Sequence, residues 1–189
     1  MLYGPEGPMS TFEEMPQRIF LDSSVLQALH RYGEFIYDGG ALAASDRVLR
    51  DSFGLQKLEA LSAIMKVGER APFEFALSQN SFREVGAASD RAYLQWAYAV
   101  LDHWRSCLEE SGVPADSKAA DLSGPRYGYL GAGDRALIRD AVVLGCDTFL
   151  TMENRLPRNA PHLQRTLGIR VVSPLGMWEL VEPWAGLFT

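Results

Sequence analysis

A short apolar run that ends in a carboxylate indicates the fold class of this chain. The segment 18–21 (Arg-Ile-Phe-Leu) is followed at once by Asp22, then by two hydroxyl residues and a helical pattern. This order of residues is typical of a buried parallel strand that turns into a helix, with the acid at the turn. Ligands of open α/β sheets bind at the turns that follow the carboxyl ends of the strands. Asp22 is therefore the first candidate site residue.

Strands and helices alternate along the rest of the chain. Further strands are expected at 73–77, 147–151 and 168–172, and helices at 24–37, 44–69 with a break near Gly54, 81–110, 134–144 and from Pro174 onward. This alternation predicts an α/β fold, a three-layer α/β/α sandwich with a mainly parallel sheet of four to five strands. Right-handed crossovers then place every strand-to-helix turn at one edge of the sheet.

The 189 residues are expected to form one domain, from 17 to 189, after a flexible lead-in at 1–16. The segment 113–133 is rich in Gly, Pro and Ser, and a loop of this length is usually functional or disordered. The helix at 81–110 carries an apolar stripe at near-heptad spacing. Packing in the core is the favoured interpretation of that stripe, and a dimer interface is the alternative. The stripe consists of Leu94, Ala97, Leu101, Trp104 and Leu108.

Four carboxylates follow or precede strands at the turns that share this edge. They are Asp22, Glu84, Asp134 and Glu153. Converging carboxylates repel one another and stay ionised only if cations compensate them. Oxygen ligands of this kind suit Mg²⁺ or Mn²⁺. The chemistry implied is metal-assisted attack of water on a phosphodiester. Asp147 begins a strand at the opposite edge and Asp140 leaves its helix on another side, so neither is included.

Helix capping is the alternative explanation for three of these acids. Acids in first helical turns complement the helix dipole, which would account for Asp22 and Asp134. The run from Ser81 to Glu84 matches a capping box. Two details favour a site instead. Asp134 heads the apolar stripe of its helix, and Glu84 is followed by small residues that allow a close approach to a neighbouring element.

These segments resemble, in order, the motifs of the PIN-domain nucleases. The first motif is similar to 19–24 (Ile-Phe-Leu-Asp-Ser-Ser), the second to 78–85, the third and fourth to 133–142 and 145–151, and the last strand to 169–174. The resemblance implies a PIN-like α/β/α domain that binds Mg²⁺ or Mn²⁺ and cleaves single-stranded or structured RNA. Many members are the toxin of a bacterial toxin–antitoxin pair and form homodimers. An antitoxin protein and a second copy of the chain are therefore candidate partners.

The metal-binding catalytic acids of this family correspond to Asp22, Glu84 and Asp134, and Ser23 and Thr151 match supporting hydroxyl positions. The fourth acid departs from the pattern, because Glu153 stands where the family usually has aspartate. Asn154 could supply a neutral oxygen there instead. The alternative function is therefore a catalytically weakened PIN-like module that binds RNA or protein. A phosphatase using Asp22 as nucleophile is disfavoured, because its second aspartate would stand at Ser24.

RNA binding by this chain needs a local basic patch or a bound cation, because the net charge is −6. Arg135 and Arg139, one helical turn apart, and Arg126 in the long loop are the candidates for phosphate contacts. A solvated face is the alternative for the helical pair. No basic-then-apolar leader precedes Met15, no apolar run could span a bilayer, and the two cysteines show no ligand spacing. These features predict a cytoplasmic protein without a membrane partner.

Overall fold

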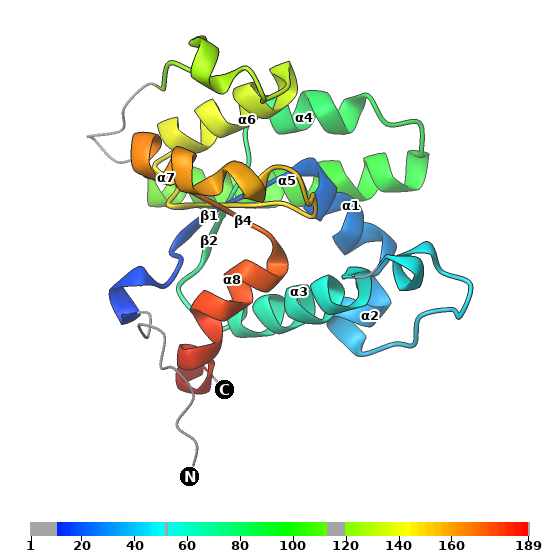
Figure 1. Ribbon diagram of the computed structural model, residues 1–189. Helices are drawn as coiled ribbons and strands as arrows, with labels where there is room; N and C mark the ends of the chain where they lie inside the picture. The colour runs from blue at the N-terminus through cyan, green and yellow to red at the C-terminus, as the bar shows by residue number, and fades with distance from the viewer. Residues whose placement is uncertain (1–10, 52, 113–119, 189) are drawn as a thin grey trace.

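The computed structural model describes residues 11–51, 53–112 and 120–188. Within these residues, four parallel strands form one sheet in the order β2-β1-β3-β4 (Figure 1). The strands are β1 (Arg18–Leu21), β2 (Glu74–Ala76), β3 (Thr148–Leu150) and β4 (Arg170–Val172). The predicted α/β fold with a parallel sheet is confirmed, and each strand lies within its predicted range.

The order of the strands places a topological switch point between β1 and β3. The chain pairs β2 with one side of β1 and then returns to pair β3 with the other side. Leu21 lies in register with Leu150, so the residues that follow β1 and β3 leave the sheet next to each other. Crevices at such switch points are where ligands bind in open α/β sheets.

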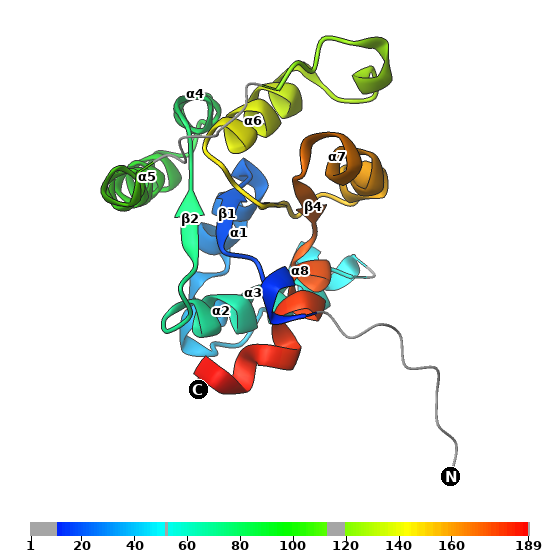
Figure 2. The ribbon, with the colours of Figure 1, turned by 90° about the vertical axis from the view of Figure 1, so that its left-hand side faces the viewer.

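Helices cover both faces of the sheet and its β2 side (Figures 1 and 2). One face is covered by α1 (Ser23–Arg31), α2 (Gly33–Asp38), α3 (Gly54–Gly68) and α8 (Pro174–Val181). The other face is covered by α6 (Ala132–Val143) and α7 (Ala160–Leu167), while α4 (Gln79–Gly86) and α5 (Arg91–Ser111) lie along the β2 side. Short 3-10 helices occupy Phe12–Glu14, Arg47–Arg50, Pro125–Tyr127, Pro157–Asn159 and Glu182–Phe188.

Alternation along β1 divides the apolar residues into two cores. Ile19 and Leu21 pack in the cluster that faces α1, α3 and α8, whereas Phe20 packs in the cluster that faces α6 and α7. The rings of Phe20 and Phe149 stack with their centroids 5.4 Å apart. Both faces of β1 are therefore buried, which explains its continuous apolar run. The stripe on α5 also packs in the core, where Ala97 and Leu101 are fully buried. The side chain of Leu108 lies outside the described residues.

Two predicted helices are each divided into two in the structure. The single helix expected at 81–110 is wrong: α4 ends at Gly86 and α5 begins at Arg91. The carboxylate of Asp90 accepts the N–H groups of Ala92 and Tyr93, so it caps a new helix. The helix expected at 24–37 is broken at Tyr32, which has φ −116° and ψ 22°. Helix α7 is not among the predicted elements.

The segment before β1 packs against the end of the chain where it is described. The rings of Phe12 and Trp184 pack edge to face, with their centroids 5.3 Å apart. The guanidinium of Arg170 donates a hydrogen bond of 2.6 Å to the carbonyl of Glu14. Of the predicted lead-in, residues 1–10 lie outside the described residues, as do 113–119 of the predicted long loop. The rest of that loop contains the buried Tyr127. None of the helices in the described residues combines the length and apolar character needed to cross a bilayer.

Candidate active site

Asp22 follows β1 and is held by two hydroxyl groups. Its backbone is extended at the N-cap position of α1, but its side chain makes no capping hydrogen bond. Instead, Oδ2 accepts hydrogen bonds from Ser24 Oγ at 2.5 Å and from Thr151 Oγ1 at 2.6 Å. Only 8% of Asp22 is exposed. The side chain of Asp22 therefore does not cap α1. It reaches instead from the end of β1 to Thr151 at the end of β3.

Thr151 follows β3 and is fully buried. Its Oγ1 accepts the N–H of Glu153 at 3.1 Å, and Ser24 Oγ accepts the N–H of Met152 at 3.0 Å. Each hydroxyl thus receives a backbone hydrogen bond and donates its own proton to Asp22. The two hydroxyls fasten the segment after β3 to the first turn of α1.

Glu84 approaches the same edge from α4. Ser78 is the N-cap of that helix, and its Oγ accepts the N–H groups of Asn80 and Ser81. The capping box therefore lies one turn before Glu84, and the capping explanation proposed for Glu84 is wrong. A Cβ atom at Gly133 would lie 3.1 Å from Glu84 Oε1. The glycine thus allows the carboxylate to lie against the first turn of α6.

Asp134 lies in that first turn and caps its own helix. Its Oδ2 accepts the N–H of Gly131 at 3.1 Å, so the capping interpretation of Asp134 describes one of its oxygens. The side chain is half-buried rather than solvated. Its charge acts on Glu84 and on Glu153, which places it in the same group of acids.

The four acids influence one another electrostatically. Burial raises the pKa of Glu84, and the charges of Asp22 and Asp134 raise it further, against a hydrogen bond from Ser23 that lowers it. Burial also raises the pKa of Glu153, and the charges of Asp22, Asp134 and Glu84 add to this effect, against the opposing charge of Arg155. The edge of the sheet therefore concentrates negative charge in partly buried surroundings.

The donor chemistry and charge of these four acids suit a divalent cation. Every donor is a carboxylate oxygen, as Mg²⁺ and Mn²⁺ prefer. A cation would also relieve the repulsion that raises the pKa of two of the acids. As the side chains lie, no group of three or more His, Cys, Asp and Glu within the described residues is arranged to hold a metal ion. For three of these acids to hold one metal ion, their side chains would have to move from these positions.

Asn154 does not turn its side-chain oxygen to the carboxylates. That oxygen accepts a hydrogen bond from Lys57 Nζ at 2.7 Å. Asp147 lies at the opposite edge, where its Oδ2 accepts the N–H groups of Gln17 and Arg18. Its exclusion from the site agrees with this position.

Two of the three predicted RNA-binding arginines, Arg126 and Arg135, contact groups other than the four acids. Hydrogen bonds from Ser123 lower the pKa of Asp121, and the charges of Arg139 and Arg126 contribute, so both arginines lie near Asp121. The guanidinium of Arg126 also lies 4.9 Å from the centroid of the Tyr127 ring. Arg135 Nε donates to the carbonyl of Leu130 at 3.1 Å and thereby holds the loop before α6.

Two other arginines share a cavity with Asp134 and Glu153. This cavity has a volume of about 520 Å³. It is lined by Asp134, Glu153, Tyr129, Gly131, Arg155, Leu156 and Arg158. Sequence reasoning missed Arg155 and Arg158. Their position just after the third strand, at the edge where the acids gather, is the signal that could have identified them.

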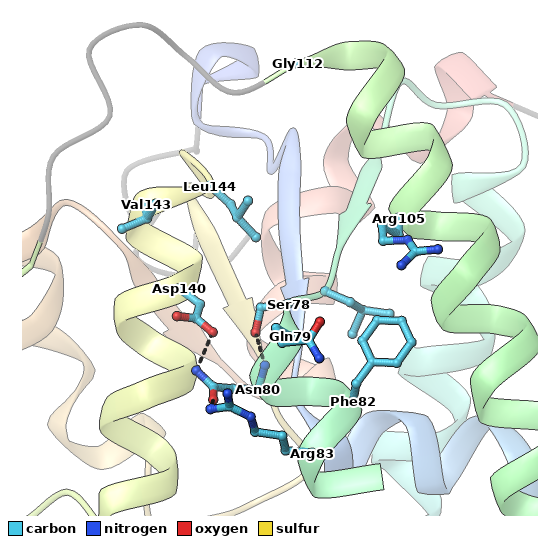
Figure 3. Close-up of a pocket in the computed structure, with 11 residues that line it drawn as sticks. Ser78, Gln79, Asn80, Phe82, Arg83, Arg105, Gly112, Asp140, Val143 and Leu144 are labelled. Carbon is cyan, nitrogen blue, oxygen red and sulfur yellow. Dashed lines mark hydrogen bonds between the residues drawn. The ribbon is translucent and has the colours of Figure 1, made fainter. Parts of the chain in front are cut away.

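A second cavity, of about 610 Å³, lies between α4, α5 and α6 (Figure 3). None of the four carboxylates lines it. Asp140 faces this cavity, where its Oδ2 accepts a hydrogen bond from Asn80 Nδ2 at 2.8 Å. Asp140 is therefore separate from the carboxylate site, in agreement with its exclusion.

Tyr93 is a further residue that sequence reasoning missed. Its ring is 5% exposed, and its hydroxyl is buried without a hydrogen-bond partner among the described residues. Burial and the charges of Asp22 and Glu84 raise the pKa of Tyr93 to about 12. A buried hydroxyl group thus lies within electrostatic reach of the carboxylates.

No family model, curated protein or solved structure matches this chain. The case for a function therefore depends on the residues of the site and their arrangement.

Proposed function

We propose that this protein is a divalent-metal-dependent endoribonuclease that cleaves phosphodiester bonds in single-stranded RNA. The observation that carries the proposal is the approach of four acids to one edge of the sheet. Asp22 is hydrogen-bonded to Thr151 after β3, Glu84 lies against Gly133 beside Asp134, and Asp134 and Glu153 line one cavity. Carboxylates gathered in this way are costly without a cation. The resemblance of the motifs to PIN-domain nucleases supports the same function.

Each carboxylate has a role in this proposal. Asp22, Glu84 and Asp134 would hold Mg²⁺ or Mn²⁺, and Glu153 would assist. When bound, such a cation polarises a phosphate oxygen and offsets the negative charge that develops during attack by water. The hydroxyls of Ser24 and Thr151 fix the orientation of Asp22, because both donate to its Oδ2.

The cavity lined by Asp134 and Glu153 is the reason to propose single-stranded RNA as the substrate. Arg155 and Arg158 supply the local positive charge that a protein with a net charge of −6 needs to hold phosphates. Tyr129 is 41% exposed and lines the same cavity, where a base could stack on its ring. Stacking on an aromatic ring beside basic groups is typical of single-strand binding.

The sequence motifs alone support the remaining parts of the proposal. They are a cytoplasmic location, a role as the toxin of a toxin–antitoxin pair, and an antitoxin protein or a second copy of the chain as partner. A reading frame for a small protein beside this one, whose product binds the purified chain, would support the toxin role.

Cleavage of a labelled single-stranded RNA tests the activity. Cleavage is expected with Mn²⁺ or Mg²⁺, and it should be lost in EDTA and in Asp22→Asn. Asp38→Asn, at an exposed position at the end of α2, is the matched control and should cleave normally. Activity that survives both EDTA and Asp22→Asn would overturn the mechanism. Calorimetry that detects no Mn²⁺ binding would favour the non-catalytic RNA- or protein-binding module instead.

A further inference from the structure

Lys57 is a buried lysine whose ammonium group binds the segment that follows β3. The residue lies on α3 and is 3% exposed. Its Nζ donates to the carbonyl of Met152 at 2.5 Å and to Asn154 Oδ1 at 2.7 Å. Lysine is rarely buried to this degree unless its charge is compensated. Burial lowers the pKa of Lys57, so keeping the ammonium group there has a cost.

The segment held by Lys57 also carries the hydrogen bonds that orient Asp22. The N–H of Met152 donates to Ser24 Oγ at 3.0 Å, and the N–H of Glu153 donates to Thr151 Oγ1 at 3.1 Å. Both hydroxyls in turn donate to Asp22 Oδ2. Met152 is therefore held on both sides, through its carbonyl by Lys57 and through its N–H by Ser24.

A direct electrostatic role does not explain the position of Lys57. Its two hydrogen bonds go to the carbonyl of Met152 and the amide oxygen of Asn154, and not to a site carboxylate. The connection from Lys57 to the acids thus runs through the backbone of the segment after β3. This segment also carries Glu153, whose side chain is exposed and needs a fixed backbone to stay near the other acids.

We propose that Lys57 is a positioning residue of the carboxylate site. Its ammonium group clamps residues 152–154 and thereby sets the orientation of Asp22, through Ser24 and Thr151, and the place of Glu153. The inference deepens the proposed nuclease function and depends on it for its effect on metal binding. Groups that orient metal ligands in this indirect way commonly change metal affinity by about 10–100-fold.

Lys57→Met tests the clamp, because it keeps an unbranched side chain that is one atom shorter and removes the donors. In the metal-free protein, hydrogen exchange at the amides of residues 151–154 is expected to become faster. Calorimetry is expected to show about tenfold weaker binding of Mn²⁺. Lys66→Met is the matched control, since Lys66 is an exposed lysine on the same helix, and it should change neither measurement.

A double-mutant cycle separates positioning from a general loss of stability. If Lys57 acts through Ser24, the loss of Mn²⁺ affinity caused by Lys57→Met should shrink in a Ser24→Ala background, because the path to Asp22 is already broken. Equal losses in both backgrounds would overturn the path through Ser24, and equal losses in a Ser24→Ala, Thr151→Val background would overturn the proposed effect of Lys57 on Asp22. If Lys57→Met fails to fold, Asn154→Ala removes one acceptor of the clamp at an exposed residue and should still speed exchange at 151–154.

Failure of the clamp and failure of the nuclease function give different results. If Asp22→Asn abolishes Mn²⁺ binding and RNA cleavage while Lys57→Met changes neither, the clamp is overturned and the nuclease function stands. If the wild-type protein binds no Mn²⁺ and cleaves no RNA, the nuclease function fails, and with it the positioning role. The exchange measurement then still shows whether Lys57 holds residues 152–154.

Discussion

The hydroxyl of Thr151 donates a 2.6 Å hydrogen bond to Oδ2 of Asp22, although 129 residues separate the two in the chain. The bond joins the ends of β1 and β3, the two strands at the switch point of the sheet. Both residues are buried, so the contact is shielded from competing water. The bond therefore fixes the first carboxylate of the site to the centre of the fold.

Thr151→Val should lower both stability and activity. The change keeps the shape of the side chain and removes a charge-assisted hydrogen bond, so the free energy of unfolding should fall by about 2 kcal/mol in urea denaturation. Thr148→Val is the control, since Thr148 is buried at the other end of β3 and donates to Asp147. That variant should lose stability but keep RNA cleavage. Normal cleavage by Thr151→Val would show that the hydroxyl does not support Asp22.

The metal-free protein should lose stability as the pH rises above the ordinary glutamate value of 4.5. The folded-state pKa of Glu84 is raised, so the native state binds more protons than the unfolded state between the two pKa values, and raising the pH through that window favours unfolding. Melting temperatures measured in EDTA at increasing pH test whether stability falls as the pH rises. Glu84→Gln should flatten the dependence, and saturating Mn²⁺ should reduce it. Identical pH profiles for the wild type and Glu84→Gln would contradict the assignment.

Gly133→Ala should separate stability from metal binding. Alanine is the better residue within a helix by about 0.5–1 kcal/mol, so the variant should melt no lower than the wild type. The new Cβ would lie 3.1 Å from Glu84 Oε1 and would displace that carboxylate. Mn²⁺ affinity measured by calorimetry should therefore fall. Gly176→Ala, in α8, adds a Cβ at an ordinary 3.6 Å contact and should leave metal affinity unchanged.

Arg155→Ala and Arg158→Ala should each weaken RNA binding. Both side chains line the cavity that contains Asp134 and Glu153, so each should account for about one phosphate contact. The slope of the logarithm of RNA affinity against the logarithm of salt concentration should become shallower by about 0.7 for each variant. Arg139→Ala, near Asp121, is the comparison and should keep the wild-type slope. If Arg139→Ala made the slope shallower and the other two variants did not, RNA would instead be bound by the α6 arginines.

Tyr93→Phe should leave stability unchanged or raise it by up to about 1 kcal/mol. The hydroxyl is buried without a partner among the described residues, so its removal relieves a desolvation cost and breaks no hydrogen bond. Thermal denaturation in EDTA checks this result. A clear loss of stability would show that the hydroxyl has a partner in the folded protein.

The positions of Asp22 and Thr151 were predictable because they depend on local rules. Each ends a buried apolar run, and the carboxyl ends of parallel strands must meet at one edge. Glu84 illustrates what such rules miss. Its sequence matches a capping box with Ser81, yet Ser78 caps the helix one turn earlier, since the chain leaves β2 in an extended conformation at that residue.

Features that depend on contacts between distant segments could not be predicted in this way. Lys57 lies in a regular helical pattern, and only packing of α3 beneath the segment after β3 shows that it is buried. The sequence of 81–110 is compatible with one continuous helix. The break between α4 and α5 arises because Asp90 caps a second helix there. Helix α7 was missed because it is only eight residues long, so that Ala160, Leu163 and Leu167 make a brief apolar stripe.

The central strands β1 and β3 and the edge strand β2, which together carry the site, differ in how readily they can open. Asp22 and Thr151 follow the two central strands, whereas Glu84 is carried by α4 after β2, a strand at the edge of the sheet that pairs with β1 alone. Local opening costs least where few strand contacts must be broken. Fraying of β2 would therefore withdraw Glu84 while the Asp22–Thr151 pair stays intact. The edge position of β2 thus makes Glu84 the acid whose support can open locally while the two central strands remain paired.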